Sequence, residues 1–127
     1  MKEVMAIIRQ NKVNATKDAL ANAGFPAFTC RKVMGRGKNS VDPALLQTIL
    51  KQGTLPLSAL GEQLSETMRL IPKRIFTLIV EEEDVEKVVK TFIEVNSTGN
   101  VGDGKIFILP IYEAYTIRSG EMTQDAY

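Results

Sequence analysis

The chain contains no histidine, no tryptophan and only one cysteine. Without histidine it cannot form a Ser-His-Asp or Cys-His nucleophile, a histidine-rich metal site or a phosphohistidine. One cysteine cannot form an internal disulfide, which suits a reducing compartment and predicts a cytoplasmic protein. No pair of carboxylates stands out as a general acid and base. These absences predict a binding protein without a catalytic site.

The chain also lacks a long apolar run and a strong net charge. No stretch of 18 apolar residues is present, so we expect no membrane-spanning helix, and the first residues show no signal peptide. The formal net charge of +1 gives no reason to expect nucleic acid or an anionic membrane as a partner. At 127 residues the simplest organisation is a single domain with its own hydrophobic core.

Two similar βαβ patterns flank a long insertion. The first half predicts strands at 3–9 and 27–34 with a helix between them. This helix would be capped by Asn11 or Asn14 and end near residue 23, before Gly24. The second half predicts strands at 74–80 and 105–111. The helix between these two strands has a buried stripe at helical spacing, formed by Val85, Val88, Val89, Phe92 and Ile93. Two such halves predict a ferredoxin-like double βαβ sandwich of the α+β class.

The apolar character of the strands predicts what covers the sheet. Helices on one face leave the other face open, yet the strand at 75–80 is apolar enough for burial on both sides. A second copy of the chain would cover the open face. Cys30, within an alternating strand, is expected to be a small buried residue.

Residues 36–71 do not fit the repeat. A connection of this length is usually functional or disordered, but this one carries leucine clusters at 45–50 and 55–64. Two interpretations remain open: a small satellite core over the sheet, or a segment that docks onto a partner and becomes ordered there.

A glycine-rich stretch at 96–107 separates the second helix from the last strand. Glycines allow positive φ and close approach, so successive N–H groups can converge on a phosphate beside a lysine. Gly99, Gly104 and Lys105 fit most of the P-loop spacing. However, Ile106 stands where a serine or threonine should hold Mg²⁺, and this loop follows a helix instead of a strand. The alternative is a simple glycine-rich turn.

The string Thr98-Gly99 followed by Gly102-Asp103-Gly104-Lys105-Ile106-Phe107 resembles the B-loop of the PII signal-transduction proteins, which are trimeric nitrogen-status sensors. Further segments fall in family order at 1–8, 35–37, 72–73 and 117–121. The resemblance therefore covers nearly the whole chain and makes 36–71 a long T-loop insertion in one PII-like domain, 1–127. It implies a trimer that binds ATP or ADP in the cleft between neighbouring subunits.

The resemblance also implies which residues form the sites. The nucleotide phosphates would contact the loop and the base of the insertion, through Gly102, Asp103, Gly104, Lys105, Gly35, Gly37 and Lys38. Ile7 and Ile79 would line the adenine pocket, and Thr29 and Arg118 would come from the adjacent subunit. Asn39 and Lys73 would bind 2-oxoglutarate, with Mg²⁺ accompanying the ATP and no metal site of the protein's own.

Three departures from the family pattern bear on these expectations. Thr116 stands where the family commonly has a second arginine, which removes a phosphate contact. Asn39 replaces the family glutamine, and residues 36–71 contain no tyrosine for modification. The long insertion, Asn39 and the stretch 25–29 look most like the nitrogenase-linked archaeal branch. In that branch two different PII-like subunits together inhibit nitrogenase by binding dinitrogenase, and 2-oxoglutarate with ATP would release the inhibition.

Two other functions compete with this interpretation. A PII-type regulator of an ammonium channel, or of another nitrogen-metabolism enzyme, is the alternative within the family. Channel plugging favours an arginine at the loop tip, but residues 40–67 hold only Lys51 as a cation. A nucleotide-using enzyme on the same fold is the third hypothesis, and the lack of histidine and of an acid–base pair argues against it.

Overall fold

The computed structural model describes residues 1–37 and 69–126. The chain divides into two compact units, residues 1–33 with 72–127 and residues 34–71. The leucine clusters at 45–50 and 55–64, together with Lys38 and Asn39, lie outside the described residues. Whether the insertion is a satellite core or a docking segment therefore stays a prediction.

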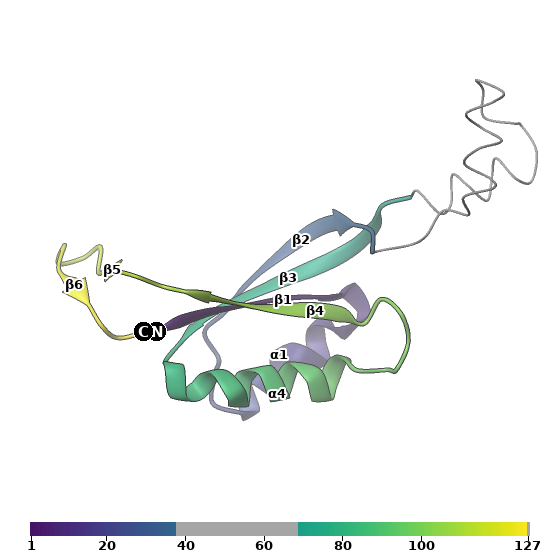
Figure 1. Cartoon of the computed structure of the whole chain (residues 1–127), viewed down its shortest axis with the longest axis horizontal. Helices are drawn as coiled ribbons and strands as arrows, with labels where there is room; N and C mark the ends of the chain where they lie inside the picture. The colour runs from purple at the N-terminus through teal and green to yellow at the C-terminus, as the bar shows by residue number, and fades with distance from the viewer. Residues whose placement is uncertain (38–68, 127) are drawn as a thin grey trace, which may run out of the picture. The chain divides into compact units, whose positions relative to one another are not determined.

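Four strands and two helices form the βαβ-βαβ order that the sequence predicts. They are β1 (Lys2–Arg9), α1 (Val13–Asn22), β2 (Thr29–Gly35), β3 (Ile71–Val80), α4 (Val85–Asn96) and β4 (Gly104–Pro110). The sheet order is β2-β3-β1-β4, and β1 runs antiparallel to both of its neighbours. Helices α1 and α4 lie on the same face of the sheet (Figure 1). The α+β ferredoxin-like fold is thus confirmed.

Alternation along the central strands builds the core on the helix side. In β1 every second residue is buried, and β3 follows the same pattern from Phe76 onward. The ring of Phe76 lies 5.1 Å from that of Phe28 and 6.0 Å from that of Phe92, measured between centroids. The buried cluster comprises Val4, Ala6, Ile8, Leu20, Phe25, Phe76, Leu78, Val80, Val88 and Phe92. All of these residues belong to the first unit.

Helix α1 ends at the predicted glycine. Gly24 has φ +95°, and its N–H donates to the carbonyl of Ala21 at 3.0 Å. The N–H of Phe25 donates to the carbonyl of Leu20 at 2.8 Å, which completes a Schellman motif. Because Phe25 and Leu20 are both buried in the core, the motif anchors the chain as it turns toward β2.

A buried polar bridge joins the two helices. The Thr16 hydroxyl donates to the carbonyl of Lys12 at 2.7 Å, so its oxygen is free to accept from the Asn96 amide at 3.2 Å. The same amide nitrogen donates to the carbonyl of Phe92 at 2.9 Å. Asn96 is the last residue of α4, so this bridge fixes the point from which the glycine loop departs.

The structure corrects several predicted details of the elements. Lys12 is the residue before α1, and neither Asn11 nor Asn14 provides a side-chain cap, because the 3₁₀ turn η1 (Gln10–Lys12) feeds directly into the helix. Ile93 is 53 % exposed because the row Val88, Phe92 and Asn96 faces the core instead. Cys30 is only half-buried, since β2 is an edge strand.

The element boundaries also shift from the predicted ones. Strand β2 begins at Thr29, two residues late, and β4 lies one residue earlier than expected. Strand β3 begins at Ile71, so it includes Pro72 and Lys73. Its pairing with β1 starts at Lys73, so the missing N–H of Pro72 costs no bond to β1. The turn η2 (Glu82–Asp84) precedes α4, and an unpredicted hairpin, β5 (Ala114–Tyr115) with β6 (Met122–Thr123), follows β4.

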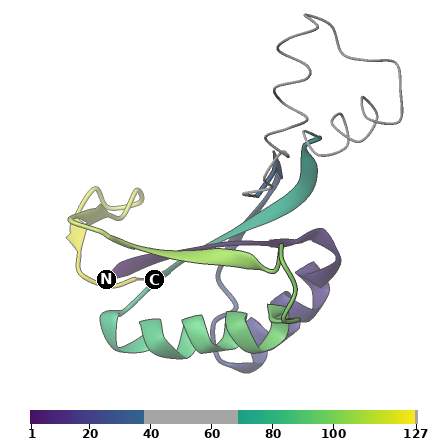
Figure 2. The ribbon, with the colours of Figure 1, turned by 45° about the vertical axis from the view of Figure 1, so that its right-hand side comes forward.

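The second face of the sheet, which we call the open face, lacks a covering helix among the described residues; Figure 2 shows both helices on the opposite side. Strand register places Met5 between Thr77 and Phe107 on this face. Met5 and Thr77 are half-buried and Phe107 is 43 % exposed. An apolar face of this kind is suited to a partner surface, and the trimer stays a prediction.

Candidate functional site

The glycine-rich loop, residues 97–104, connects the end of α4 to the start of β4. Three of its glycines have positive φ, with values of +81° at Gly99, +97° at Gly102 and +121° at Gly104. At Gly104 a Cβ atom would lie 1.9 Å from the carbonyl oxygen of Ile7. Only glycine therefore allows β4 to begin against the backbone of β1 at this point.

Asp103 holds the loop closed. One carboxylate oxygen accepts from the N–H groups of Thr98, at 2.7 Å, and of Gly99, at 3.1 Å. The other oxygen accepts from the Thr98 hydroxyl and from the Arg9 guanidinium, at 2.7 Å for the latter. The N–H of Asn100 in turn donates to the Thr98 hydroxyl oxygen at 3.3 Å. The carboxylate of Asp103, a residue predicted to contact phosphate, is thus hydrogen-bonded to the loop itself and to Arg9.

These bonds hold the pKa of Asp103 below its ordinary range. The side-chain and backbone hydrogen bonds from Thr98 are the main causes, and the bond from Gly99 and the charge of Arg9 act in the same direction, against the opposing effect of desolvation. Together they lower the pKa of the carboxyl from 3.8 to about 2. Asp103 is therefore ionised throughout the neutral range.

Arg9 is a site residue that the sequence did not reveal. It ends β1, and besides its ion pair with Asp103 it donates to the Val101 carbonyl at 2.8 Å and to the Thr98 hydroxyl at 3.3 Å. Arg9 and Asp103 are 94 residues apart, so no local pattern connects them. The available signal was a basic residue at the end of a strand that pairs with β4.

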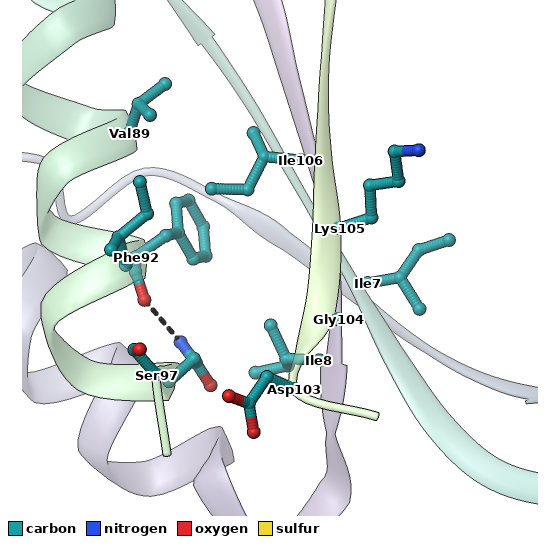
Figure 3. A pocket seen from close by; sticks show the side chains of 11 residues that line it. Ile7, Ile8, Val89, Phe92, Ser97, Asp103, Gly104, Lys105 and Ile106 are labelled. Atoms are coloured by element: carbon teal, nitrogen blue, oxygen red, sulfur yellow. Dashed lines mark hydrogen bonds between the residues drawn. The ribbon is translucent and has the colours of Figure 1, made fainter. Parts of the chain in front are cut away.

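Two lysines belong to the same corner of the open face. Lys73 stands opposite Arg9 in the strand register and donates to the Gly102 carbonyl at 2.9 Å. Lys105 stands opposite Ile7, and its ammonium lies 5.8 Å from the Phe107 ring centroid. The side chains of Lys105 and Ile7 lie on the opposite side of β4 from Val89 and Phe92 (Figure 3). Arg9, Lys73 and the Asp103 carboxylate thus meet at the glycine loop, and Lys105 projects from the same face one residue beyond it.

Two hollows are lined by six of the predicted nucleotide residues. A hollow of about 410 Å³ lies between α4 and the start of β4; its lining includes Val89, Phe92 and Asn96 together with the predicted residues Ile7, Asp103, Gly104 and Lys105. A second, of about 350 Å³, is lined by Ala27, Phe28, Thr29, Thr77, Ile79 and Ala126.

Ile7 and Ile79, which were expected to share one adenine pocket, line different hollows of this chain. Ile7 stands opposite Ile75, and Ile79 stands opposite Glu3, so the two isoleucines are four residues apart along the strands. That separation corresponds to roughly 13 Å. Within one chain, Ile79 shares its hollow with another predicted residue, Thr29.

The remaining predicted residues come from other segments of the chain. Gly35 ends β2 and Gly37 follows it, both in the unit 34–71. Arg118 lies in the turn between β5 and β6. Two backbone hydrogen bonds close this turn: the Gly120 N–H donates to the Thr116 carbonyl at 2.7 Å, and the Thr116 N–H donates to the Glu121 carbonyl at 2.8 Å. Lys38 and Asn39 are outside the described residues.

The described ranges, 1–37 and 69–126, contain neither a metal-ligand cluster nor a membrane-spanning helix. No cluster of three or more cysteine, aspartate or glutamate side chains is arranged to hold a metal ion there. None of the helices in the same ranges is long and apolar enough to cross a bilayer.

Comparison with known proteins identifies relatives along the full chain. The family model described as nitrogen regulatory protein P-II matches residues 1–121. The nitrogen fixation nifHD region GlnB-like protein 2 of Methanothermobacter marburgensis is 42 % identical over 127 residues, which cover 99 % of both chains. The corresponding protein 1 of Methanothermococcus thermolithotrophicus is 44 % identical over 121 residues, which cover 95 % of this chain and 97 % of that protein.

The fold has a solved counterpart. The crystal structure of Arabidopsis thaliana PII bound to citrate is similar with a TM-score of 0.67 and 25 % sequence identity. The match covers 97 % of this chain and 85 % of the plant chain.

Proposed function

The chain belongs to the nitrogen regulatory protein P-II family, and from this premise we propose that it is a cytoplasmic, non-enzymatic signalling protein. It binds ATP or ADP together with 2-oxoglutarate and regulates a nitrogen-metabolism enzyme, dinitrogenase, through residues 36–71. The observation that carries the proposal is that Arg9 and Lys73 bind the glycine loop, while Lys105, the second residue of β4, projects from the same face of the sheet.

The loop corner is suited to a polyphosphate. Arg9 and Lys73 already donate to loop oxygens, and the ammonium of Lys105 lies on the same face as Ile7. Three cations against the single carboxylate of Asp103 leave a surplus of positive charge, which favours an anionic ligand. Ile7 adds an apolar surface for a base or ribose. Mg²⁺ would enter with the ATP, since the residues here offer it few oxygen ligands.

The separation of the two hollows supports an inter-subunit site. Gly104 and Lys105 supply the phosphate contacts on one subunit, where Ile7 borders the adenine, and Thr29 and Ile79 complete the adenine pocket from the next. Arg118 comes from that same neighbour. The open face of the sheet would be buried in the resulting trimer. The presence of both a protein 1 and a protein 2 in Methanothermococcus thermolithotrophicus supports a hetero-oligomer with a second PII-like subunit as the other assembly.

Lys73 connects the effector to the target-binding segment. It lies in β3, two residues beyond the end of the segment 36–71, and its ammonium reaches the loop. A carboxylate of 2-oxoglutarate accepts from Lys73, with Arg9 as a second cation. The family resemblance adds Asn39 to this effector site and assigns Gly35, Gly37 and Lys38 to the nucleotide phosphates. The effector then favours one state of the segment over another, provided that its affinities for the two differ.

Dinitrogenase is the proposed target because the similar archaeal proteins are named for the nifHD region. A pull-down from nitrogen-fixing cells, with and without 2-oxoglutarate and Mg²⁺-ATP, tests this. We expect dinitrogenase to be captured without the effector and released with it. Capture of an ammonium channel instead would show that the channel, and not dinitrogenase, is the target. Equal capture of dinitrogenase under both conditions would show that 2-oxoglutarate does not control target binding.

A deletion isolates the role of the segment. Residues 41–68 are replaced by a short Gly/Ser linker. Because the buried core that the described residues form lies in the first unit, the variant should fold and bind ATP. It should no longer hold dinitrogenase. A variant that still captures the enzyme would place the target surface elsewhere, and a variant that fails to fold would assign the leucines to the core.

A further inference from the structure

The carboxylate of Asp103 is saturated by donors of its own surroundings. Oδ2 accepts from the N–H groups of Thr98 and Gly99, and Oδ1 accepts from the Thr98 hydroxyl and the Arg9 guanidinium. A carboxylate has about four acceptor sites, and four donors fill them. No acceptor site is left for the hydroxyls of a nucleotide or for the waters of its metal ion.

This arrangement has the form of an anion-binding site. Consecutive backbone N–H groups, a hydroxyl and a guanidinium converge on one negative group, as they do around bound phosphates. Here the negative group belongs to the loop itself. Its pKa of about 2 keeps it charged under all physiological conditions, so the internal anion is permanent.

We propose that Asp103 is a positioning residue, a built-in anion that fixes the shape of loop 97–104 for nucleotide binding without touching the nucleotide. The inference rests on the proposed function, because it assigns Asp103 a role toward that ligand. It also replaces the direct phosphate contact that the sequence alone suggested for this residue.

The closed loop explains how a residue without ligand contact governs the site. The Asp103 carboxylate turns the N–H groups of Thr98 and Gly99 inward, away from any ligand. The N–H groups of Val101 and Gly102 find no acceptor within the described residues, and these are the donors that a phosphate would use. At Gly102 a Cβ atom would lie 3.1 Å from the Arg9 guanidinium, so the glycine lets the arginine close over the loop.

The anion also distributes the positive charge. Arg9 is paired with Asp103 and with the Val101 carbonyl, so much of its charge is neutralised at the loop. Lys105, like Lys73, has no such carboxylate partner among the described residues, so the two lysines carry the charge left for the ligands. Loss of the Asp103 charge would therefore both loosen the loop and free Arg9.

Chemical rescue tests the proposal. Asp103→Ala removes the anion but leaves its donors, so a small carboxylate from solution can take its place. We expect the variant's ATP affinity, measured by calorimetry, to fall at least about tenfold. Sodium formate at roughly 50 mM should restore most of it, whereas sodium chloride of equal ionic strength should not. Asp18→Ala, an exposed acid on α1, is the matched control and should bind like the wild type.

Hydrogen exchange provides a readout that needs no nucleotide. The amides of Thr98 and Gly99 should be protected in the wild type, exposed in Asp103→Ala and protected again with formate. Thr98→Val keeps the carboxylate and removes one donor, so it should show a smaller, partial loss if Asp103→Ala proves too unstable to study. Unchanged ATP affinity in Asp103→Ala, or formate that restores neither affinity nor protection, would overturn the proposal.

The two hypotheses fail differently. If the wild type binds no ATP, the proposed nucleotide function is wrong and so is the positioning role. If the wild type binds ATP and Asp103→Ala loses it beyond rescue while the amides stay protected, Asp103 contacts the nucleotide directly. In that case only the positioning role is rejected.

Discussion

The ammonium group of Lys73 lies 2.9 Å from the carbonyl oxygen of Gly102 and donates a hydrogen bond to it. The bond ties the beginning of β3 to the glycine loop across 29 residues of sequence. Lys73 follows the segment 36–71 closely in sequence. In the function we propose, a ligand that draws its ammonium away from Gly102 would act on the loop and the segment together. Such linkage is reciprocal, so a bound target should weaken effector binding in return.

Lys73→Met should therefore reduce binding of 2-oxoglutarate in the presence of Mg²⁺-ATP. The variant keeps the length of the side chain and loses a charge-assisted hydrogen bond, which contributes about 1.5–3 kcal/mol. That corresponds to roughly ten- to a hundredfold in affinity. Calorimetry measures it, with the exposed Lys17→Met on α1 as control. Equal affinities in Lys73→Met and wild type would remove Lys73 from the effector site.

Lys105→Ala should weaken ATP binding by a similar factor. Lys105 projects from the open face beside Ile7, and a phosphate bound at the loop would lose its cationic contact. The same titration with Lys90→Ala, an exposed residue of α4, controls for a general loss of positive charge. If Lys105→Ala binds ATP as well as the wild type, the glycine loop is only a turn.

Gly104→Ala should destabilise the fold itself. The Cβ atom would meet the Ile7 carbonyl at 1.9 Å, and φ is +121°, a conformation that costs about 1–3 kcal/mol for an L-residue. We expect a loss of at least about 2 kcal/mol in the free energy of unfolding, measured with urea. Gly35→Ala is the control, because its Cβ meets nothing within 4 Å, and it should change stability by less than about 1 kcal/mol. Equal stabilities of the two variants would contradict the close approach of β4 to β1.

The stability that Asp103 provides should disappear in acid. Its folded-state pKa of about 2 lies below the ordinary value of 3.8, so folding favours the ionised carboxylate. The contribution is therefore complete above about pH 4 and is lost as pH falls through 2. Urea unfolding of the wild type and Asp103→Asn between pH 2 and 6 should give a difference that shrinks toward the acid end. A difference that stays constant over this range would show that the charge is not involved.

Phe107→Asp should disrupt the assembly. Phe107 is 43 % exposed on the open face, which a trimer would bury, and a carboxylate there would have to be desolvated. Light scattering should report a trimer for the wild type and a smaller species for the variant. Ile93→Asp, at a 53 % exposed position on α4, should remain trimeric. A monomeric wild type would contradict both the trimer and the inter-subunit site.

The sequence by itself determined the four strands and two helices of the double βαβ fold and their order, but not the hairpin of β5 and β6. Period-two alternation in β1 and β3, the helical stripe of α4 and the stop at Gly24 are local patterns, and each is produced by neighbours within a few residues. The Gly102 to Phe107 string likewise identified the family. Boundaries shifted by one to three residues, and the Asn11 and Asn14 caps were wrong, because the 3₁₀ turn before α1 depends on how β1 ends.

Only the tertiary structure decided how the site residues combine. Arg9 reaches Asp103 across 94 residues of sequence, and Asn96 reaches Thr16 across 80. Local sequence patterns carry no information about contacts between residues so far apart in the chain. The register that places Ile7 beside Lys105 and separates it from Ile79 is set when β1 pairs with both β3 and β4. Asp103 shows the difference most clearly. The motif places it in the loop, and only the structure shows that its carboxylate accepts four hydrogen bonds, from Thr98, Gly99 and Arg9, because Arg9 reaches the loop only when β1 pairs with β4.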